Sequence, residues 1–260
     1  MNRNLLNSQQ VMIYSLLGIA LFMVVWYGAV AMQVTPKQFL PPPHEVLIKL
    51  STLLTQPFSG FTLISHIASS FQRFLYGFLL AVVVGIPLGL SMALSKNTER
   101  LFTPFFESIR FVAPIAWVPF AALWFGTGIG GPVLVIFMGA FPPVLINTYR
   151  GAIHVDKKFI EAAKMLGAGK IRLMTEVLFP ASIPSIVAGL RISAGLGWQS
   201  LIGAELIVAS SGVGYMMVKG QASIQTDIVM SGMIAIGFIG LTIDVILRVI
   251  EKLVSKYREN

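Results

Sequence analysis

Charged side chains inside apolar stretches are the residues of this chain that could do chemistry. Arg73, Arg191 and Glu205 lie within or at the start of such stretches, and Asp244 and Arg248 follow in a later one. A charge in hydrocarbon is costly and usually faces a partner or a water-filled cavity. These positions are therefore candidates for ion pairs or for a transport pathway, and the i, i+4 spacing of Asp244 and Arg248 predicts a local salt bridge.

The three isolated charges have different expected roles. Arg191 and Glu205 share a helical face but lie about 21 Å apart at 1.5 Å per residue, too far to pair. We expect Arg191 to bond to carbonyls at the inner boundary, in preference to a pathway role. Glu205 could form an ion-paired gate near the outer mouth, although it would repel an anion. Arg73 could snorkel outward or attract an anion.

Polar side chains in the same stretches could replace water around a crossing anion. Helix packing is the competing role for each of them. The candidate substrate-pathway residues are Trp198, Gln199, Ser200, Asn147, Arg73 and Glu205.

Catalytic and metal chemistry is not expected in this chain. It has no cysteine, which excludes disulfides, thiolate metal sites and cysteine nucleophiles. Its histidines, His44, His66 and His154, all fall in predicted loops. The histidine or carboxylate pairs of an intramembrane enzyme are therefore missing, and we assign no catalytic and no metal residue.

A nucleotide-binding loop is also missing. Gly169-Lys170 resembles the end of one, but Lys164 and Ile171 occupy the positions that require Gly and Ser or Thr. We expect no ATP hydrolysis by this chain.

Composition requires that the elements carrying these residues lie in a membrane. Hydrophobic residues make up 55% of the 260 residues and charged residues only 12%, far fewer charges than in ordinary globular proteins. We predict an all-α membrane protein with a single domain over residues 1–260. Its six spans are expected near 11–31, 70–95, 101–125, 131–149, 183–210 and 228–250. The first apolar run is longer than the core of a signal peptide, so we expect it to stay uncleaved.

The distribution of lysine and arginine predicts the orientation. With the N-terminus in the cytoplasm, nearly all loop cations lie inside, and only Lys37, Lys49 and Lys219 remain outside. Both termini and the loop 150–180 are then cytoplasmic. The net charge of +8 reflects this topology, and we expect no nucleic-acid partner.

Residues 36–68 lie outside in this topology. Pro41-Pro42-Pro43 is a rigid extended piece, and the apolar positions after His44 recur at helical spacing. We expect an amphipathic helix that lies on the membrane, with packing and anchorage as its role.

The loop 150–180 has the pattern of a docking helix. Val155, Phe159, Ala162 and Leu166 share one helical face, and Gly167 is placed to end the helix in a left-handed conformation. Asp156 is a candidate first-turn acid. A second amphipathic piece, Ile171 to Phe179, is expected to stop at Pro180, which can open the next helix as its first-turn residue. On physical grounds alone, a groove on another protein and a surface of lipid headgroups are equally good places for the first helix.

The same loop resembles the EAA loop of ABC importer permeases. Glu161-Ala162-Ala163, Gly167, Val177 and Phe179-Pro180 have the spacing of that loop, with Val177 and Phe179 where the family usually has Ile and Leu. Further segments resemble the subgroup importing nitrate, bicarbonate, taurine and aliphatic sulfonates: Phe39 to Pro43, Pro114 to Pro119, Leu123 to Gly126, Gly189 to Arg191, Gly197-Trp198 and Ala204 to Ile207.

The resemblance implies a type I ABC importer permease whose loop is a cytoplasmic coupling helix. The implied ATPase-coupling residues are Glu161, Ala162, Ala163, Gly167, Phe159 and Leu166. The implied partners are two ATP-binding subunits, which bind ATP and Mg, a second permease copy in a homodimer, an extracytoplasmic substrate-binding protein and membrane lipid. The implied place is the inner membrane of a bacterium.

The resemblance also implies alternating access, in which closing of the ATPases on ATP moves the coupling loops and opens the pathway outward. A sulfonate or taurine is the first expected substrate, followed by nitrate or bicarbonate. Two other classes stay open from the residues alone: an ion-coupled secondary transporter, and, less favoured, an intramembrane enzyme.

Overall fold

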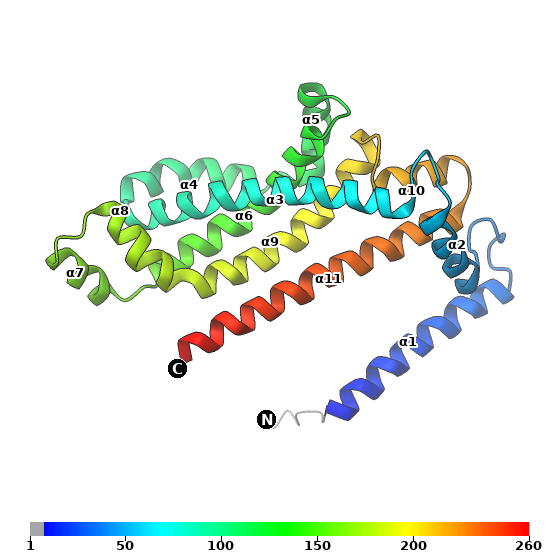
Figure 1. Ribbon diagram of the computed structural model, residues 1–260, viewed down its shortest axis with the longest axis horizontal. Helices are drawn as coiled ribbons and strands as arrows, with labels where there is room; N and C mark the ends of the chain where they lie inside the picture. The colour runs from blue at the N-terminus through cyan, green and yellow to red at the C-terminus, as the bar shows by residue number, and fades with distance from the viewer. Residues whose placement is uncertain (1–7, 260) are drawn as a thin grey trace. The chain divides into compact units, whose positions relative to one another are not determined.

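The chain is almost entirely helical. The structure, a computed structural model, describes residues 8–259, and within this range there are helices and one isolated bridge between Phe58 and Phe61 but no strand. The helices are α1 (Ser8–Ala31), α2 (Pro43–Thr55), α3 (Leu63–Leu94), α4 (Lys96–Arg110), η1 (Pro114–Trp117), α5 (Val118–Phe125), α6 (Gly130–Ile153), α7 (Lys157–Met165), α8 (Lys170–Arg172), η2 (Leu173–Leu178), α9 (Phe179–Val208), α10 (Val213–Ala222) and α11 (Thr226–Glu259) (Figure 1).

Five helices in the described range are long and apolar enough to cross a membrane, and a bent pair brings the total to six. The prediction of an all-α membrane protein with about six spans is confirmed. The bent pair corresponds to the predicted span 101–125, which is not straight: α4 and the η1–α5 segment meet at 93°. The break precedes Pro114, because a residue before proline is disfavoured in the helical conformation and Ala113 has an extended ψ of 137°.

The chain divides into two compact units. One is formed by the segments up to Leu63 and Met216–Ile234, and the other by Ile64–Tyr215 and the segment from Ala235 onward. The assignment of residues 1–260 to one domain stays a prediction.

In the first unit, the predicted helix after the triple proline is α2. Its buried residues Val46 and Leu53 face protein, and the Ser231 hydroxyl donates to the Val46 carbonyl at 3.1 Å. Lys49 and Asp227 form an ion pair at 3.4 Å. The apolar face of α2 therefore packs on the start of α11, as the predicted packing role requires, and the predicted position of this helix on the membrane stays a prediction.

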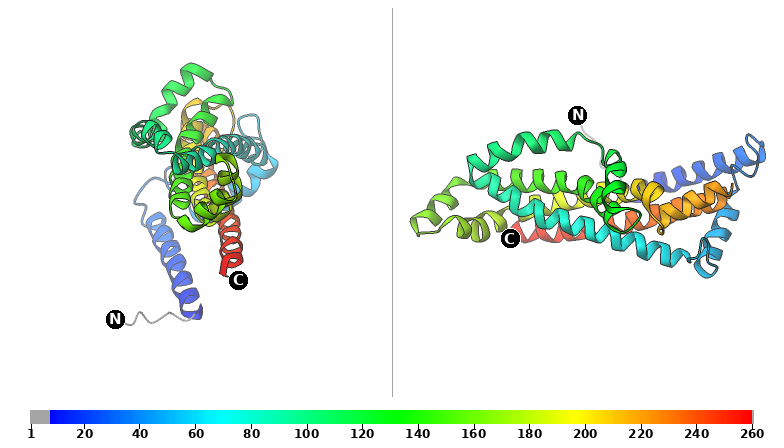
Figure 2. Two further views of the ribbon diagram at one scale, coloured as in Figure 1. Left: turned by 90° about the vertical axis from the view of Figure 1, so that its left-hand side faces the viewer. Right: turned by 90° about the horizontal axis from the view of Figure 1, so that it is seen from above.

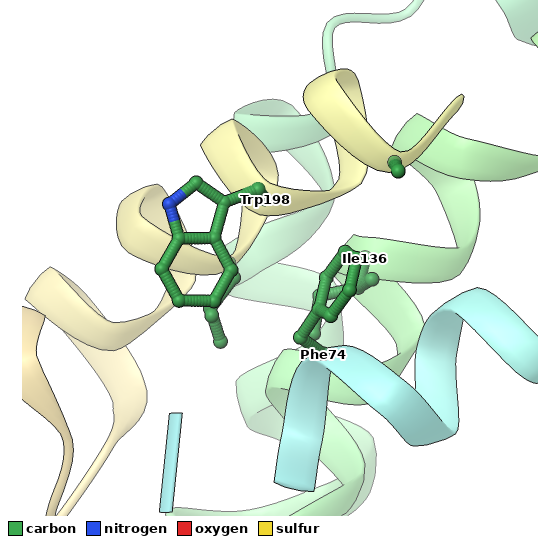
Figure 3. Packing of buried hydrophobic residues seen from close by; sticks show 5 residues of the cluster. Phe74, Ile136 and Trp198 are labelled. Carbon is green, nitrogen blue, oxygen red and sulfur yellow. The ribbon is translucent and has the colours of Figure 1, made fainter. Parts of the chain in front are cut away.

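In the second unit, α6 and α9 form the largest helix contact, and α3 packs on α6. Glycines make this approach possible: a Cβ at Gly139 would overlap Ser200, and one at Gly189 would come within 2.5 Å of Asn147. Small residues at such interfaces let helix backbones approach closely in membranes. The core between them is apolar, and Figure 3 shows Trp198 of α9 beside Phe74 of α3 and Ile136 of α6.

The fifth span begins earlier than predicted, at Lys170. The helix that starts at Lys170 passes through the π-helical η2 into α9, so a continuous span runs from Lys170 to Val208. Pro180 lies in the first turn of α9, as predicted, where a missing N–H is tolerated, but the helical piece before it does not stop there. The wider π-helical turn precedes the proline and joins the two helices.

Candidate coupling helix and polar sites of the spans

Helix α7 lies at one end of the second unit, next to α8 (Figures 1 and 2). The Asp156 carboxylate accepts a hydrogen bond from the Lys158 N–H at 3.0 Å and caps the helix. Asp156 is thus the N-cap residue and not, as predicted, a member of the first turn. A capping carboxylate satisfies an amide that the helix itself cannot.

One face of α7 packs on the unit and the other is bare. Val155 and Ile160 contact an apolar cluster of Leu90, Ala152 and Leu178. Phe159 and Leu166, in contrast, are 63% and 86% exposed, and Glu161 and Ala162 are exposed as well, with Ala163 half-buried. The predicted shared face of Phe159, Ala162 and Leu166 is therefore presented to the surroundings, but Val155 does not belong to it.

Gly167 ends α7 in the left-handed conformation, with φ +79°. Its N–H donates to the Lys164 carbonyl at 3.0 Å, and the Ala168 N–H donates to the Ala163 carbonyl at 3.0 Å. A glycine at this position closes the helix without the steric cost of a side chain. The predicted helix end at Gly167 is confirmed.

A buried ion pair lies near the other end of α9. The Glu205 carboxylate accepts hydrogen bonds from Arg73 and Ser70, each at 2.8 Å, and from the Gly214 N–H at 3.0 Å. Arg73 also donates to the carbonyl and the hydroxyl of Ser211, each at 2.7 Å. The network joins α3, α9 and the turn before α10, and the buried Arg73 does not snorkel outward, whereas a role for it in attracting an anion stays a prediction.

Two glycines permit the turn to close over this carboxylate. Gly212 has φ +112°, and a Cβ there would overlap the Glu205 carboxylate. A Cβ at Gly214 would come within 2.7 Å of the Glu205 Cβ. The Gly212 N–H donates to His66 Nδ1 at 3.2 Å, and His66 is fully buried in α3, not in a loop as predicted.

A second charged network joins α9 to α11. Arg191 pairs with Asp244 at 2.7 Å and with Glu251 at 3.1 Å, and Arg248 pairs with Asp244 at 2.6 Å. The predicted Asp244–Arg248 bridge is confirmed. The expected carbonyl partners of Arg191 are wrong, because α11 brings two carboxylates within its reach.

Two candidate pathway residues have their polar groups engaged within the helix bundle. The Trp198 indole N–H donates to the Ile236 carbonyl at 3.2 Å, and its ring packs edge-on against Phe74 at 5.5 Å. The Asn147 amide donates to the Pro143 carbonyl at 2.8 Å. Both contacts are those of helix packing.

Gln199 and Ser200 line a cavity of about 330 Å³ between α4, η1, α6 and α9. Gln199 is exposed, whereas the Ser200 hydroxyl donates to the Leu196 carbonyl at 2.6 Å. Of the six predicted pathway residues, these two are the ones on this cavity. The sequence missed Arg110, which lies on the same cavity at the end of α4.

Comparison with known proteins shows what this architecture is. Residues 85–258 match the family described as "Binding-protein-dependent transport system inner membrane component". The chain belongs to this permease family. Membership favours the ABC permease over the secondary transporter and the intramembrane enzyme, and it makes the chain a multi-pass transport subunit of an inner membrane.

The permease is similar to several named relatives over most of its length. It is 35% identical to the taurine transport system permease protein TauC of Escherichia coli (strain K12), covering 90% of this chain and 86% of the relative. It is 34% identical to the putative aliphatic sulfonates transport permease protein SsuC of Bacillus subtilis (strain 168), with 93% and 86% covered. It is 32% identical to the nitrate import permease protein NrtB of Synechocystis sp., with 91% and 87% covered.

A solved structure shares the fold of the permease. The crystal structure titled as inward facing conformations of the MetNI methionine ABC transporter matches with a TM-score of 0.59 at 17% identity, covering 72% of this chain and 95% of that chain. The expected type I ABC importer permease fold is confirmed.

Proposed function

We propose that this permease is the membrane subunit of an ATP-driven importer for a small anion, first of all an aliphatic sulfonate or taurine, and otherwise nitrate or bicarbonate. Support comes from relatives named for taurine, aliphatic sulfonates and nitrate, each more than 30% identical over most of the chain.

The bare face of α7 is the observation that carries the coupling role. Exposed apolar side chains at helical spacing fit a groove on a protein partner. Phe159, Ala162 and Leu166 would enter a cleft of the ATP-binding subunit. Glu161 and Ala163 would border the contact, and Gly167 would turn the chain away from it. ATP and Mg would be bound by that partner subunit.

Membership in the family supports an assembly with several partners. Two ATP-binding subunits, a second copy of this chain and an extracytoplasmic substrate-binding protein would complete the importer in a bacterial inner membrane. The distribution of the loop cations supports a cytoplasmic position for α7 and both termini, by the positive-inside rule. Closing of the ATPases on ATP would move the α7 helices and open the pathway outward.

Replacing Gly167 tests the coupling role. A β-branched residue at φ +79° costs about 1–3 kcal/mol of local strain. Gly167→Val should therefore abolish ATP-driven uptake while the protein still inserts and co-purifies with its second copy. Gly169→Ala is the matched control, because φ there is −72° and no atom lies within 4 Å of the new methyl group. Normal uptake by Gly167→Val would sink the coupling role of this loop.

The substrate is tested on the assembled complex in proteoliposomes with its binding protein. Taurine, an alkanesulfonate, nitrate and bicarbonate would each be added, and ATPase stimulation and uptake measured. Stimulation and uptake by at least one of the four is expected. A complex that hydrolyses ATP but responds to none of them would overturn the proposed substrate class.

A further inference from the structure

The cavity beside Gln199 lies at the break of the third span. Its walls come from the end of α4, from the bend and η1, and from the facing surfaces of α6 and α9. At about 330 Å³ it is at the small end of the range for ligand pockets, which are largely apolar with a few polar groups. Broken helices at membrane depth are tolerated where they border such a cavity.

Arg110 is the charged group of this cavity. It is the last residue of α4, directly before the 93° bend. Its guanidinium pairs with Glu107 at 2.6 Å, and both side chains are at least one-third exposed. An exposed i, i+3 pair contributes little free energy, so the guanidinium can exchange Glu107 for a stronger acceptor. A planar guanidinium matches the paired oxygens of an oxyanion.

The wall opposite is formed by α6 and α9. Pro142 and Pro143 of α6 both line the cavity and have no amide N–H to donate to the preceding turn. Gln199 of α9 is exposed at the cavity and carries two amide donors. Met138 and Leu196 supply apolar surface between them. A solute with a charged head and a short carbon chain would contact both the polar groups and the apolar surface of this cavity.

We propose that this cavity binds the transported solute, with Arg110 pairing with its anionic head and the Gln199 amide donating to the same head. The inference rests on the proposed import of a small anion. Met138 and Leu196 hold the carbon chain. Taurine and short alkanesulfonates reach both the polar and the apolar wall, whereas nitrate and bicarbonate leave the apolar wall uncovered. Arg110 and Gln199 are thus specificity-determining residues of the permease.

Substitution of Arg110 in the full complex tests the proposal by uptake kinetics. Loss of a charge-assisted hydrogen bond corresponds to about a tenfold to hundredfold loss of affinity, so Arg110→Gln should raise the KM for taurine or ethanesulfonate by that factor. Arg110→Lys keeps the positive charge, so its KM should lie between those of the wild type and Arg110→Gln. Arg100→Gln, at an exposed position of the same helix, should keep the wild-type KM. An unchanged KM in Arg110→Gln overturns the proposal.

Cysteine labelling tests the same cavity without relying on the charge change. Because the chain has no cysteine, Gln199→Cys in a complex with cysteine-free partner subunits gives each permease copy a single thiol at the cavity. Taurine or ethanesulfonate should slow its reaction with a methanethiosulfonate at least severalfold, and nitrate should slow it less. Equal labelling with and without every anion overturns the site.

The two hypotheses fail differently. If the wild-type complex imports none of the four anions, the proposed function falls and the site falls with it. If the wild type imports one of them and the Arg110 and Gln199 variants behave as the wild type, only the site falls.

Discussion

Helix α9 carries two charged networks, one near its C-terminal end and one near its middle, and the two networks differ in burial. At Glu205, near the C-terminal end, the side chains of Arg73 and Glu205 are 6% and 0% exposed. At Arg191, near the middle, the side chains of Arg191 and Asp244 are 31% and 36% exposed. A buried pair is screened little by salt or water, and an open pair is screened by both. The same helix is thus connected to its neighbours by one network of fixed geometry, at Glu205, and by one that can adjust, at Arg191.

The two networks also differ in how the carboxylate is satisfied. Glu205 takes hydrogen bonds from three different groups and would be left as a buried charge if α9 moved away from α3. Asp244 is shared between Arg191 on α9 and Arg248 on its own helix. It would keep Arg248 if α9 and α11 separated. Motion of α9 against its neighbours is therefore less costly at Arg191 than at Glu205, and Arg191 is the nearer of the two along the chain to η2, α8 and α7.

The largest expected effect is at the buried pair. Glu205→Leu leaves Arg73 charged and unpaired, and loss of one partner of a buried pair costs about 3–5 kcal/mol. The melting temperature of the purified protein in detergent should fall sharply. The double variant Arg73→Met/Glu205→Leu removes both charges and should melt above the single variant. If Glu205→Leu is as stable as the wild type, the ion pair does not stabilise the contact between α3 and α9.

Gly212→Ala should come next. The alanine must adopt φ +112° and its methyl group meets the Glu205 carboxylate, so the cost includes about 1–3 kcal/mol of backbone strain. Gly195→Ala is the control, because no atom lies within 4 Å of the added methyl group and alanine is favoured within a helix. The control should melt at or above the wild-type temperature. Equal melting of the two variants would mean that the turn is not held against Glu205.

The sequence predicted the spans and the end of α7, because hydropathy and glycine chemistry are local. It did not predict which distant side chains meet. Arg73 and Glu205 are 132 residues apart, and their pairing depends on how α3 and α9 pack, which no spacing reveals. Arg191 was assigned carbonyl partners for the same reason. Arg110 is not among the predicted pathway residues, since the bend that places it on the same cavity as Gln199 becomes evident in three dimensions.

Asp244→Asn should lower the melting temperature less than either Glu205→Leu or Gly212→Ala. It removes the charge that faces both Arg191 and Arg248, and partly exposed pairs contribute about 0.2–1 kcal/mol each. Glu251 keeps Arg191 paired at 3.1 Å. The melting temperature should fall by a few degrees at low salt, and the difference from wild type should shrink at high salt. If Asp244→Asn lowers the melting temperature as much as Glu205→Leu does, the two networks contribute equally to stability.

The smallest expected effect belongs to Arg248→Gln. Its i, i+4 pair with Asp244 is half-exposed on one side and should contribute about 0.3–0.5 kcal/mol. If Arg248 is needed by Asp244 only when Arg191 is absent, then Arg248→Gln should leave the stability almost unchanged, because Arg191 still pairs with Asp244. Combining Arg248→Gln with Arg191→Gln should then cost more than the sum of the two single changes, since Asp244 loses its last cation. If the two changes in stability are strictly additive, neither arginine compensates for the loss of the other as the partner of Asp244.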